Sequence, residues 1–258
     1  MSPETLRSSL RERSRAGAIH LGISAAIAAL SALVVFFLWY PAPFRELSGG
    51  RELFLLLVSV DVVLGPLVTF SIFSRKKAWP VLRRDLAIIG VLQLAALAYG
   101  MYTAFVARPV YVAFEYDRFR VVHAIEVPRN LLPQAPAGMR TLPLFGPRML
   151  ALRDFAGPDE KYQLTLQALE GLPLGARPEL WEPYYNAVPR VLAAARPLAP
   201  LRQRFPAHAT AIDRAIQASG LPVEQLVYVP VIGRKTFWTA LLDKSTGEIV
   251  GYVPLDPY

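Results

Sequence analysis

The chain has 258 residues, no cysteine, a mean hydropathy of +0.33 and a formal net charge of +8 at pH 7. The lack of cysteine excludes disulfides, a thiolate nucleophile and Cys-ligated metals, and the hydropathy is high for a wholly soluble protein. Five of the eight excess positive charges precede residue 108, where they flank three apolar blocks. That placement is typical of membrane proteins and argues against a nucleic-acid partner.

The first apolar block covers residues 17–40, behind a polar tail at residues 1–16 that carries four arginines. Its length of roughly 24 residues is enough to cross a bilayer and too long for a signal-peptide core. No small-x-small cleavage pattern precedes Pro41, so the block predicts a retained membrane anchor. Small residues at helical spacing predict a face that another helix can approach closely; they are Ala25, Ala28, Ala29 and Ala32.

The second block, residues 53–73, is apolar but carries one acid, Asp61, near its middle. A carboxyl group at membrane depth is costly and must face protein or water, so we expect the neighbouring helices to pack around this one. Asp61, Gly65 and Thr69 recur every four residues and therefore share one helix face. Four alternative roles remain for Asp61: a proton relay, intramembrane acid catalysis, contact with a partner helix, or a hydrogen bond that fixes the bundle.

A proline adds a second irregularity to this block. Pro66 has no N–H and cannot donate a hydrogen bond to the carbonyl of Val62. The sequence therefore predicts a kink, with a free backbone acceptor on the neighbouring turn.

The third block, residues 86–106, follows a strongly basic connector at residues 74–85. Because Lys and Arg gather on the cytoplasmic side, the N-terminal tail and this connector are predicted to be cytoplasmic. Residues 17–107 would then form a three-span transmembrane region, with residues 108–258 on the opposite side, which in a bacterium is the periplasm.

Depth counting suggests which side chains of the spans meet. At about 1.5 Å per helical residue, Asp61 and Tyr99 both lie roughly 18–20 Å from the cytoplasmic ends of their blocks. Gln93 lies at about 10 Å, near the depth of Gly65 and Thr69. Tyr99 is therefore the predicted partner of Asp61.

Residues 108–258 have an ordinary globular composition and predict a soluble α+β domain with an antiparallel sheet. Strands are predicted at both ends of this half, within 109–124 around a tight turn at Asp117-Arg118, and at 225–232, 236–242 and 248–253. Helices are predicted at 158–169, in pieces over 179–201, and at 207–219. The first of these helices places Tyr162, Leu166 and Leu169 on one face, whereas residues 129–158 are Pro-rich and read as irregular.

No pattern in the chain predicts catalysis, a cofactor or a metal site. His20, His123 and His208 lie in different elements without metal-ligand spacing, and the common nucleotide-binding and hydrolase motifs are missing from the sequence. The candidate functional residues are instead those of the spans, as contacts within the bundle or with a partner: Asp61, Gly65, Pro66, Thr69, Gln93 and Tyr99.

Specific motifs in the first half of the chain resemble one family, the TfpX/TfpZ type IV pilin accessory proteins of Gram-negative bacteria. They are His20, Phe36-Phe-Leu-Trp-Tyr-Pro41, Glu46-Leu-Ser-Gly-Gly-Arg-Glu-Leu-Phe54, Val60-Asp-Val-Val-Leu-Gly-Pro-Leu-Val-Thr69, Arg84-Asp-Leu86, Gln93-Leu94, Tyr99-Gly100 and Arg108-Pro-Val-Tyr111. The second half is similar mainly in its arrangement and in Asp243-Lys-Ser-Thr-Gly-Glu-Ile249.

The resemblance implies an inner-membrane chaperone, not an enzyme, that stabilises a type IV pilin or modulates its assembly and surface presentation. It identifies no site residues. A pilin before assembly has an apolar N-terminal helix in the membrane and a globular head in the periplasm. The predicted bundle would hold that helix, within the lipid bilayer, while the proline-rich domain contacts the head.

Two other classes of function are weighed against this one. A membrane-bound enzyme or small transporter would use Asp61, but we expect either to need more than three spans and one intramembrane acid. A sensor would need a cytoplasmic output domain, and the tail and the basic connector are each too short to fold as one.

Overall fold

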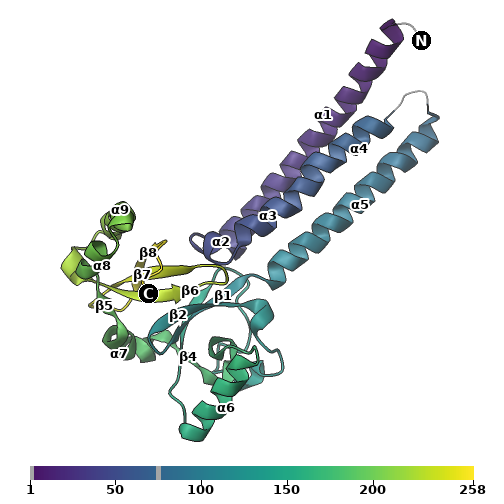
Figure 1. Cartoon of the computed structure of the whole chain (residues 1–258). Helices are drawn as coiled ribbons and strands as arrows, with labels where there is room; N and C mark the ends of the chain where they lie inside the picture. Colours follow the sequence, from purple (N-terminus) through teal and green to yellow (C-terminus); the bar gives the residue numbers. More distant parts are fainter. Residues whose placement is uncertain (1–2, 74–76) are drawn as a thin grey trace. The chain divides into compact units, whose positions relative to one another are not determined.

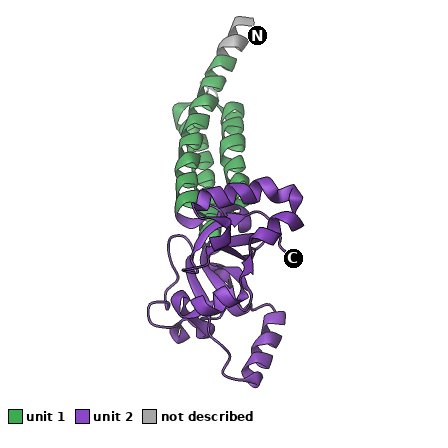
Figure 2. Ribbon diagram, turned by 90° about the vertical axis from the view of Figure 1, so that its left-hand side faces the viewer, with its two compact units in different colours: residues 1–37, 50–105 green, residues 38–49, 106–258 purple. Residues whose placement is uncertain are grey.

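The computed structural model describes residues 3–73 and 77–258, which divide into two compact units (Figure 2). One unit is helical and comprises the chain up to Phe37 together with Gly50–Phe105. The other comprises Leu38–Gly49 and Val106–Tyr258 and contains the sheet. Residues 74–76, the start of the predicted basic connector, lie outside the described residues, as do residues 1 and 2 of the tail.

Three helical stretches of the first unit are long and apolar enough to cross a membrane: Leu10–Trp39, Gly50–Ile72 and Trp79–Val106. The first consists of α1 (Pro3–Leu33) and the π-helix η1 (Val34–Trp39). The second consists of α3 (Gly50–Ser59), the π-helix η2 (Val60–Leu64) and α4 (Gly65–Ile72), and the third is α5 (Trp79–Val106).

α1 packs on the second stretch through small residues spaced by seven. Gly17, Ser24 and Ser31 are buried, and a Cβ at Gly17 would lie 3.4 Å from Cβ of Phe70 on α4. Side chains this small let helix backbones approach closely. On the predicted alanine face, Ala25 and Ala29 are exposed whereas Ala28 and Ala32 are half-buried, so contact of this face with another helix stays a prediction.

α5 is the least buried of the three stretches. Only Leu82, Ile89 and Ala104 are buried along the described part of this helix. It approaches α3 closely at Gly100, where a Cβ would overlap Cδ1 of Leu57. Most of the apolar surface of α5 is therefore open to lipid or to another helix.

The second unit is built on one eight-stranded sheet with the path β4-β3-β1-β2-β6-β7-β8, and β5 pairs with β6 beside it (Figure 1). The strands are β1 (Pro109–Glu115), β2 (Arg118–His123), β3 (Arg148–Leu152), β4 (Trp181–Pro183), β5 (Arg196–Pro197), β6 (Leu226–Ile232), β7 (Phe237–Asp243) and β8 (Ile249–Val253). β1 pairs with β3 in parallel, and β2 pairs with β6 in parallel. The sheet is therefore mixed, and the prediction of an antiparallel sheet was wrong.

The parallel pairs escaped prediction because their strands are far apart in sequence. Neighbouring parallel strands need a crossover connection of a dozen or more residues, and β3 lies inside the Pro-rich stretch that was read as irregular. The predicted hairpin of β1 and β2 is confirmed, with its turn at Tyr116-Asp117, one residue earlier than expected. The three predicted C-terminal strands are confirmed as β6, β7 and β8.

Four α-helices follow β3 in the second unit: α6 (Pro158–Leu169), α7 (Tyr184–Ala194), α8 (Ala199–Arg204) and α9 (Ala209–Ser219). α7 contacts β3 and β4, and α9 contacts β8. α6 has the predicted limits, and α9 ends as predicted at Gly220, which adopts the left-handed conformation at φ 70° that glycine tolerates best.

α6 is attached to the unit by polar contacts. Arg153 donates two hydrogen bonds to the carboxylate of Glu160, at 3.1 and 2.8 Å, and the N–H of Ala156 donates to the same group. Further along the helix, Arg177 donates to the side chain of Gln167. The hydrogen bonds from Arg153, followed by that from Ala156, lower the pKa of Glu160 to about 2.

The segment Leu38–Gly49 belongs to the core of this unit. Its short helix α2 (Phe44–Leu47) places Phe44 and Leu47 in the cluster that also buries the faces of β1, β2, β6 and β7. The Leu38 carbonyl accepts from the N–H of Gly146 at 2.7 Å, and the Leu47 carbonyl accepts from that of Arg234 at 3.1 Å. A connection between two apolar helices is thus a structural part of the sheet unit.

We expect Leu47→Ala to destabilise the sheet unit by about 2–5 kcal/mol, because it removes a fully buried side chain and leaves a cavity. Arg45→Ala on the same helix is the matched control, since Arg45 is exposed and its ion pair with Glu46 contributes at most about 1 kcal/mol. Thermal unfolding of the detergent-solubilised protein measures both variants. Equal stabilities would contradict a core role for this segment.

We also expect acid to loosen α6. A carboxylate with a lowered pKa stabilises the fold fully above its unfolded value near 4.5, and that contribution is lost as the pH falls through about 2. The protection factors of the α6 amides, taken relative to the intrinsic exchange rate at each pH, should therefore fall between these pH values, whereas in Glu160→Gln they should already be low and change less over the same range. If the variant and the wild type show the same pH profile, the Arg153–Glu160 contact does not hold the helix.

Candidate functional site

Pro66 leaves a backbone carbonyl without its donor in the middle of the second apolar stretch. η2 has the π register, in which a carbonyl accepts from the N–H five residues later. The carbonyl of Asp61 would therefore need the N–H of Pro66, which proline lacks. The side chain of Gln93 on α5 supplies a donor, with Nε2 3.3 Å from this oxygen. The acceptor that needs a partner is thus that of Asp61, and not that of Val62 as predicted, because the turn is wound as a π-helix.

A second polar contact joins α1 to α4 beside the first. Nδ1 of His20 and Oγ1 of Thr69 share a hydrogen bond at 2.6 Å, and Thr69 is buried. Gly65 makes room for both contacts, since a Cβ there would overlap Nε2 of Gln93 and lie 3.0 Å from Nε2 of His20. The polar cluster, which we define as His20, Asp61, Gly65, Thr69 and Gln93, therefore connects all three apolar stretches.

The carboxyl group of Asp61 differs from the rest of the cluster. Its Oδ1 is buried and has no hydrogen-bond partner within residues 3–73 and 77–258. A buried polar atom left unpaired costs about 1–3 kcal/mol. This oxygen is therefore the atom of the polar cluster whose hydrogen-bonding capacity the described residues leave unused.

Tyr99 does not belong to the polar cluster, and the prediction that it is the partner of Asp61 was wrong. Its side chain is 74% exposed, and Gln93 reaches the backbone of Asp61 instead. The depth count failed because it started the third helix at residue 86, whereas α5 begins at Trp79. Counting from the true end of α5 moves Gln93 deeper, toward Asp61.

His20 is the member of the polar cluster that sequence reasoning missed as a contact residue. The signal that could have found it is depth. His20 lies three residues from the start of the first apolar block and Thr69 four residues from the end of the second, so antiparallel spans bring them to the same level.

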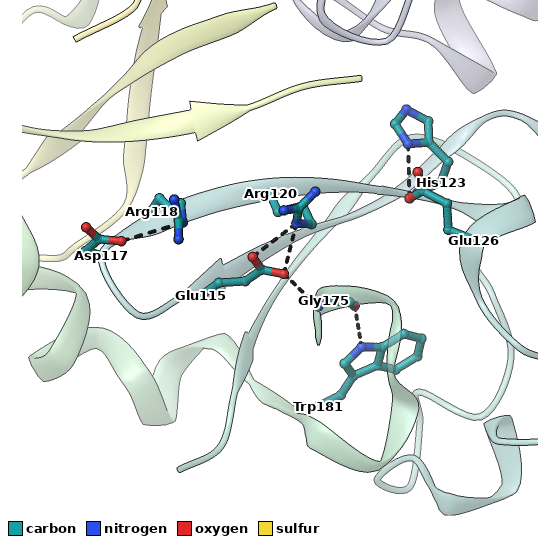
Figure 3. Close-up of polar contacts among 8 residues, drawn as sticks. All are labelled: Glu115, Asp117, Arg118, Arg120, His123, Glu126, Gly175 and Trp181. Carbon is teal, nitrogen blue, oxygen red and sulfur yellow. Dashed lines mark hydrogen bonds and ion pairs between the residues drawn. The ribbon is translucent and has the colours of Figure 1, made fainter. Parts of the chain in front are cut away.

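The sheet unit has its own polar contacts, which Figure 3 shows on the inner strands. Glu115 is buried on β1, accepts hydrogen bonds from Nε of Arg120 at 3.1 Å and accepts one from the N–H of Gly175 at 2.6 Å. The Gly175 carbonyl in turn accepts from Nε1 of Trp181 at 2.8 Å. A Cβ at Gly175 would lie 2.5 Å from Oε1 of Glu115, so glycine is needed for this close approach.

His123 and Glu126 form a second polar pair at the end of β2. The backbone N–H of His123 donates to Glu126 at 2.9 Å, and the ring Nδ1 lies 3.3 Å from the same carboxylate oxygen (Figure 3). Burial alone would raise the pKa of Glu126, but the hydrogen bonds and charge of His123, with the charge of Arg120, lower it. These contacts cap the 3₁₀ turn that follows β2.

The chemical capacity of the polar cluster is hydrogen bonding between helices. Across the described ranges, no group of three or more His, Asp or Glu side chains could hold a metal ion. Polar side chains in apolar helices contribute about 0.6–2 kcal/mol each to helix association. The hydrogen bonds of the polar cluster therefore hold the three apolar stretches of this unit to one another.

Comparison with known proteins gives several matches. A family model described as "Fimbrial assembly protein FimB" matches residues 8–49. The chain is 34% identical over 242 residues to the fimbrial assembly protein of serogroup I from Dichelobacter nodosus, which covers 93% of this chain and 94% of the relative. The serogroup E1 protein of the same organism is 32% identical with the same coverage. No solved structure matches the chain.

We expect Gly65→Ala to weaken packing of the three helices by about 0.6–1.7 kcal/mol, because the new methyl group displaces Gln93 from the Asp61 carbonyl. Gly90→Ala on α5 is the control, since a Cβ there meets nothing within 4 Å. Thermal unfolding in detergent measures both. In a Gln93→Ala background the cost of Gly65→Ala should shrink, and full additivity of the two changes would contradict the coupling.

Proposed function

This chain belongs to the family of fimbrial assembly proteins, and from that premise we propose that it is a type IV pilin accessory protein of the TfpX/TfpZ kind. It stabilises a pilin subunit before assembly and modulates its presentation at the surface. The motifs of the first half support the type IV assignment, and the family supports a role in fimbrial assembly without catalysis.

The observation that carries the proposal is the unpaired Oδ1 of Asp61 beside a loosely packed helix. α5 buries few residues along its described length, and Gln93 makes its side-chain hydrogen bond to the second stretch. A partner helix that carries a hydrogen-bond donor would satisfy Asp61 once this half-buried side chain turns toward it, and would cover apolar surface of α5 at the same time. The polar cluster, with Pro66 beside it, is then a recognition site for the apolar helix of the pilin.

The arrangement of the sheet unit supports the proposed membrane topology. Leu38–Gly49 and Val106–Tyr258 form one compact unit, which supports a topology with both segments on the same side of a membrane. Three spans agree with it, since the first connection and the end of the third span would then share a side. The basic residues of the tail and of residues 77–85 favour the cytoplasm for the opposite side. The sheet unit would then lie in the periplasm of a bacterium and contact the head of the pilin.

Deletion of the protein is expected to lower the amounts of membrane and surface pilin, because an unassembled subunit would lack its stabilising partner. Immunoblots of whole cells, membranes and sheared surface fractions measure this, with the wild-type gene restored in trans as the control. Crosslinked pull-down from membranes should recover the pilin with the protein. Unchanged pilin in the deletion strain, together with its absence from the pull-down, would sink the proposal.

Substitutions of Asp61 distinguish recognition of a partner helix by this side chain from an enzymatic or transport role of the acid. If its oxygen accepts a hydrogen bond from a partner helix, Asp61→Asn retains pilin capture, because the amide oxygen still accepts, while Asp61→Ala lowers capture several-fold. A membrane-bound enzyme or small transporter that uses the acid would lose its activity in Asp61→Asn, with protein level intact. A pilin phenotype in Asp61→Asn as severe as in Asp61→Ala would favour that alternative.

A further inference from the structure

α6 is held to the sheet unit by its polar side. Glu160 is bound by Arg153, and Gln167 by Arg177, which is itself buried. Leu164 lies on the same side and is partly buried against the core cluster that contains Trp181. These contacts come from two successive turns of the helix, so they fix its rotation about its own axis.

The opposite side of α6 is apolar and uncovered. Tyr162, Leu166 and Leu169 are 63%, 39% and 80% exposed, and no residue of the described helix is buried. Their spacing of four and three residues places them in one row, which we call the α6 stripe. The sequence pattern is that of a helix that buries its apolar face, but in the structure that face is exposed.

A second copy of the chain fits the α6 stripe poorly. Three partly exposed side chains offer on the order of 300 Å² of apolar surface. Two copies would then bury roughly 600 Å², against about 1,200 Å² for a stable interface. Membrane tethering would offset that deficit for a second copy as well, so charge decides: two copies would set Asp159 and Glu170 of one helix against those of the other, and like charges repel.

A lipid surface also fits poorly, because of charge. Helices that lie on anionic membranes carry Lys and Arg on the polar face. α6 and its C-cap carry a single Lys161 against Asp159, Glu160 and Glu170, so the helix would be repelled.

We propose that the α6 stripe is a docking surface for a segment of the pilin head that presents apolar side chains flanked by lysine or arginine. The proposal rests on the function proposed above. Asp159 and Glu170 are exposed at the two ends of the helix and attract the flanking cations. A small contact suffices because both proteins are tethered to one membrane, which raises their effective concentration.

Site-specific photocrosslinking in cells tests this surface. A benzophenone side chain placed at Tyr162 or Leu169 of the full-length protein should crosslink to the pilin about tenfold more than one placed at Gln163, which is exposed on the same helix outside the stripe. Crosslinks only to a second copy, or only to lipid, would overturn the proposal. Size-exclusion chromatography in detergent and flotation with vesicles containing phosphatidylglycerol identify those two outcomes independently.

Variants of the stripe separate this inference from the proposed function. Tyr162→Ser/Leu169→Ser should keep the unfolding temperature of the sheet unit, since both side chains are exposed, and should lower pilin capture about tenfold. Gln163→Ser/Thr165→Ser is the matched control. Glu170→Lys should reduce pilin capture further, because it replaces an attractive charge with a repulsive one. If the Tyr162→Ser/Leu169→Ser variant captures pilin as well as the wild type does, while deletion of the protein still lowers pilin, the docking surface is overturned and the proposed function stands. If deletion leaves pilin unchanged, the proposed function itself fails.

Discussion

A proline inside an apolar helix creates the constraint on which the helical unit depends. In water, a carbonyl deprived of its N–H partner bonds to solvent, but at membrane depth it must find a donor in the protein. Because this turn has the π register, the carbonyl that loses its donor is that of Asp61 and not that of Val62. The side-chain amide of Gln93 on the third helix donates to it instead. One side-chain amide thus does what a backbone N–H would do, and it does so from another helix.

The polar cluster around that bond depends on the absence of a side chain. Gly65 lies under both Gln93 and His20, so any larger residue would separate the helices that the hydrogen bonds join. Close packing elsewhere in the unit follows the same rule, with Gly17 against Phe70 and Gly100 against Leu57. Hydrogen bonds set which helices meet, and small residues set how closely. Within the polar cluster, the buried carboxyl oxygen Oδ1 of Asp61 is left without a donor among the described residues.

Local patterns in the sequence predicted the elements well, and long-range partners poorly. Length and hydropathy reveal three spans, and Pro158 followed by Gly171 delimits α6, because these signals act over a few residues. The parallel strand β3 is a short apolar run in a Pro-rich stretch, so nothing local distinguishes it. Gln93 was placed at the wrong depth because the end of a helix beyond its apolar core is invisible to hydropathy. The outward face of α6 was equally hidden, since amphipathic spacing shows that a face exists and not what covers it.

The position of Leu47 in the core of the sheet unit sets an order of events during synthesis. The turn after β6 holds it: a Cβ at Gly233 would lie 2.5 Å from its carbonyl oxygen, and the next N–H, of Arg234, donates to that oxygen. Roughly 190 residues separate the two, so at ribosomal speeds of about 5–20 residues per second Leu47 waits on the order of 10–40 s for its partner. A nascent chain that stops short of β6 therefore leaves part of the apolar surface of Phe44 and Leu47 uncovered, because β6 and β7 supply much of the cluster around them.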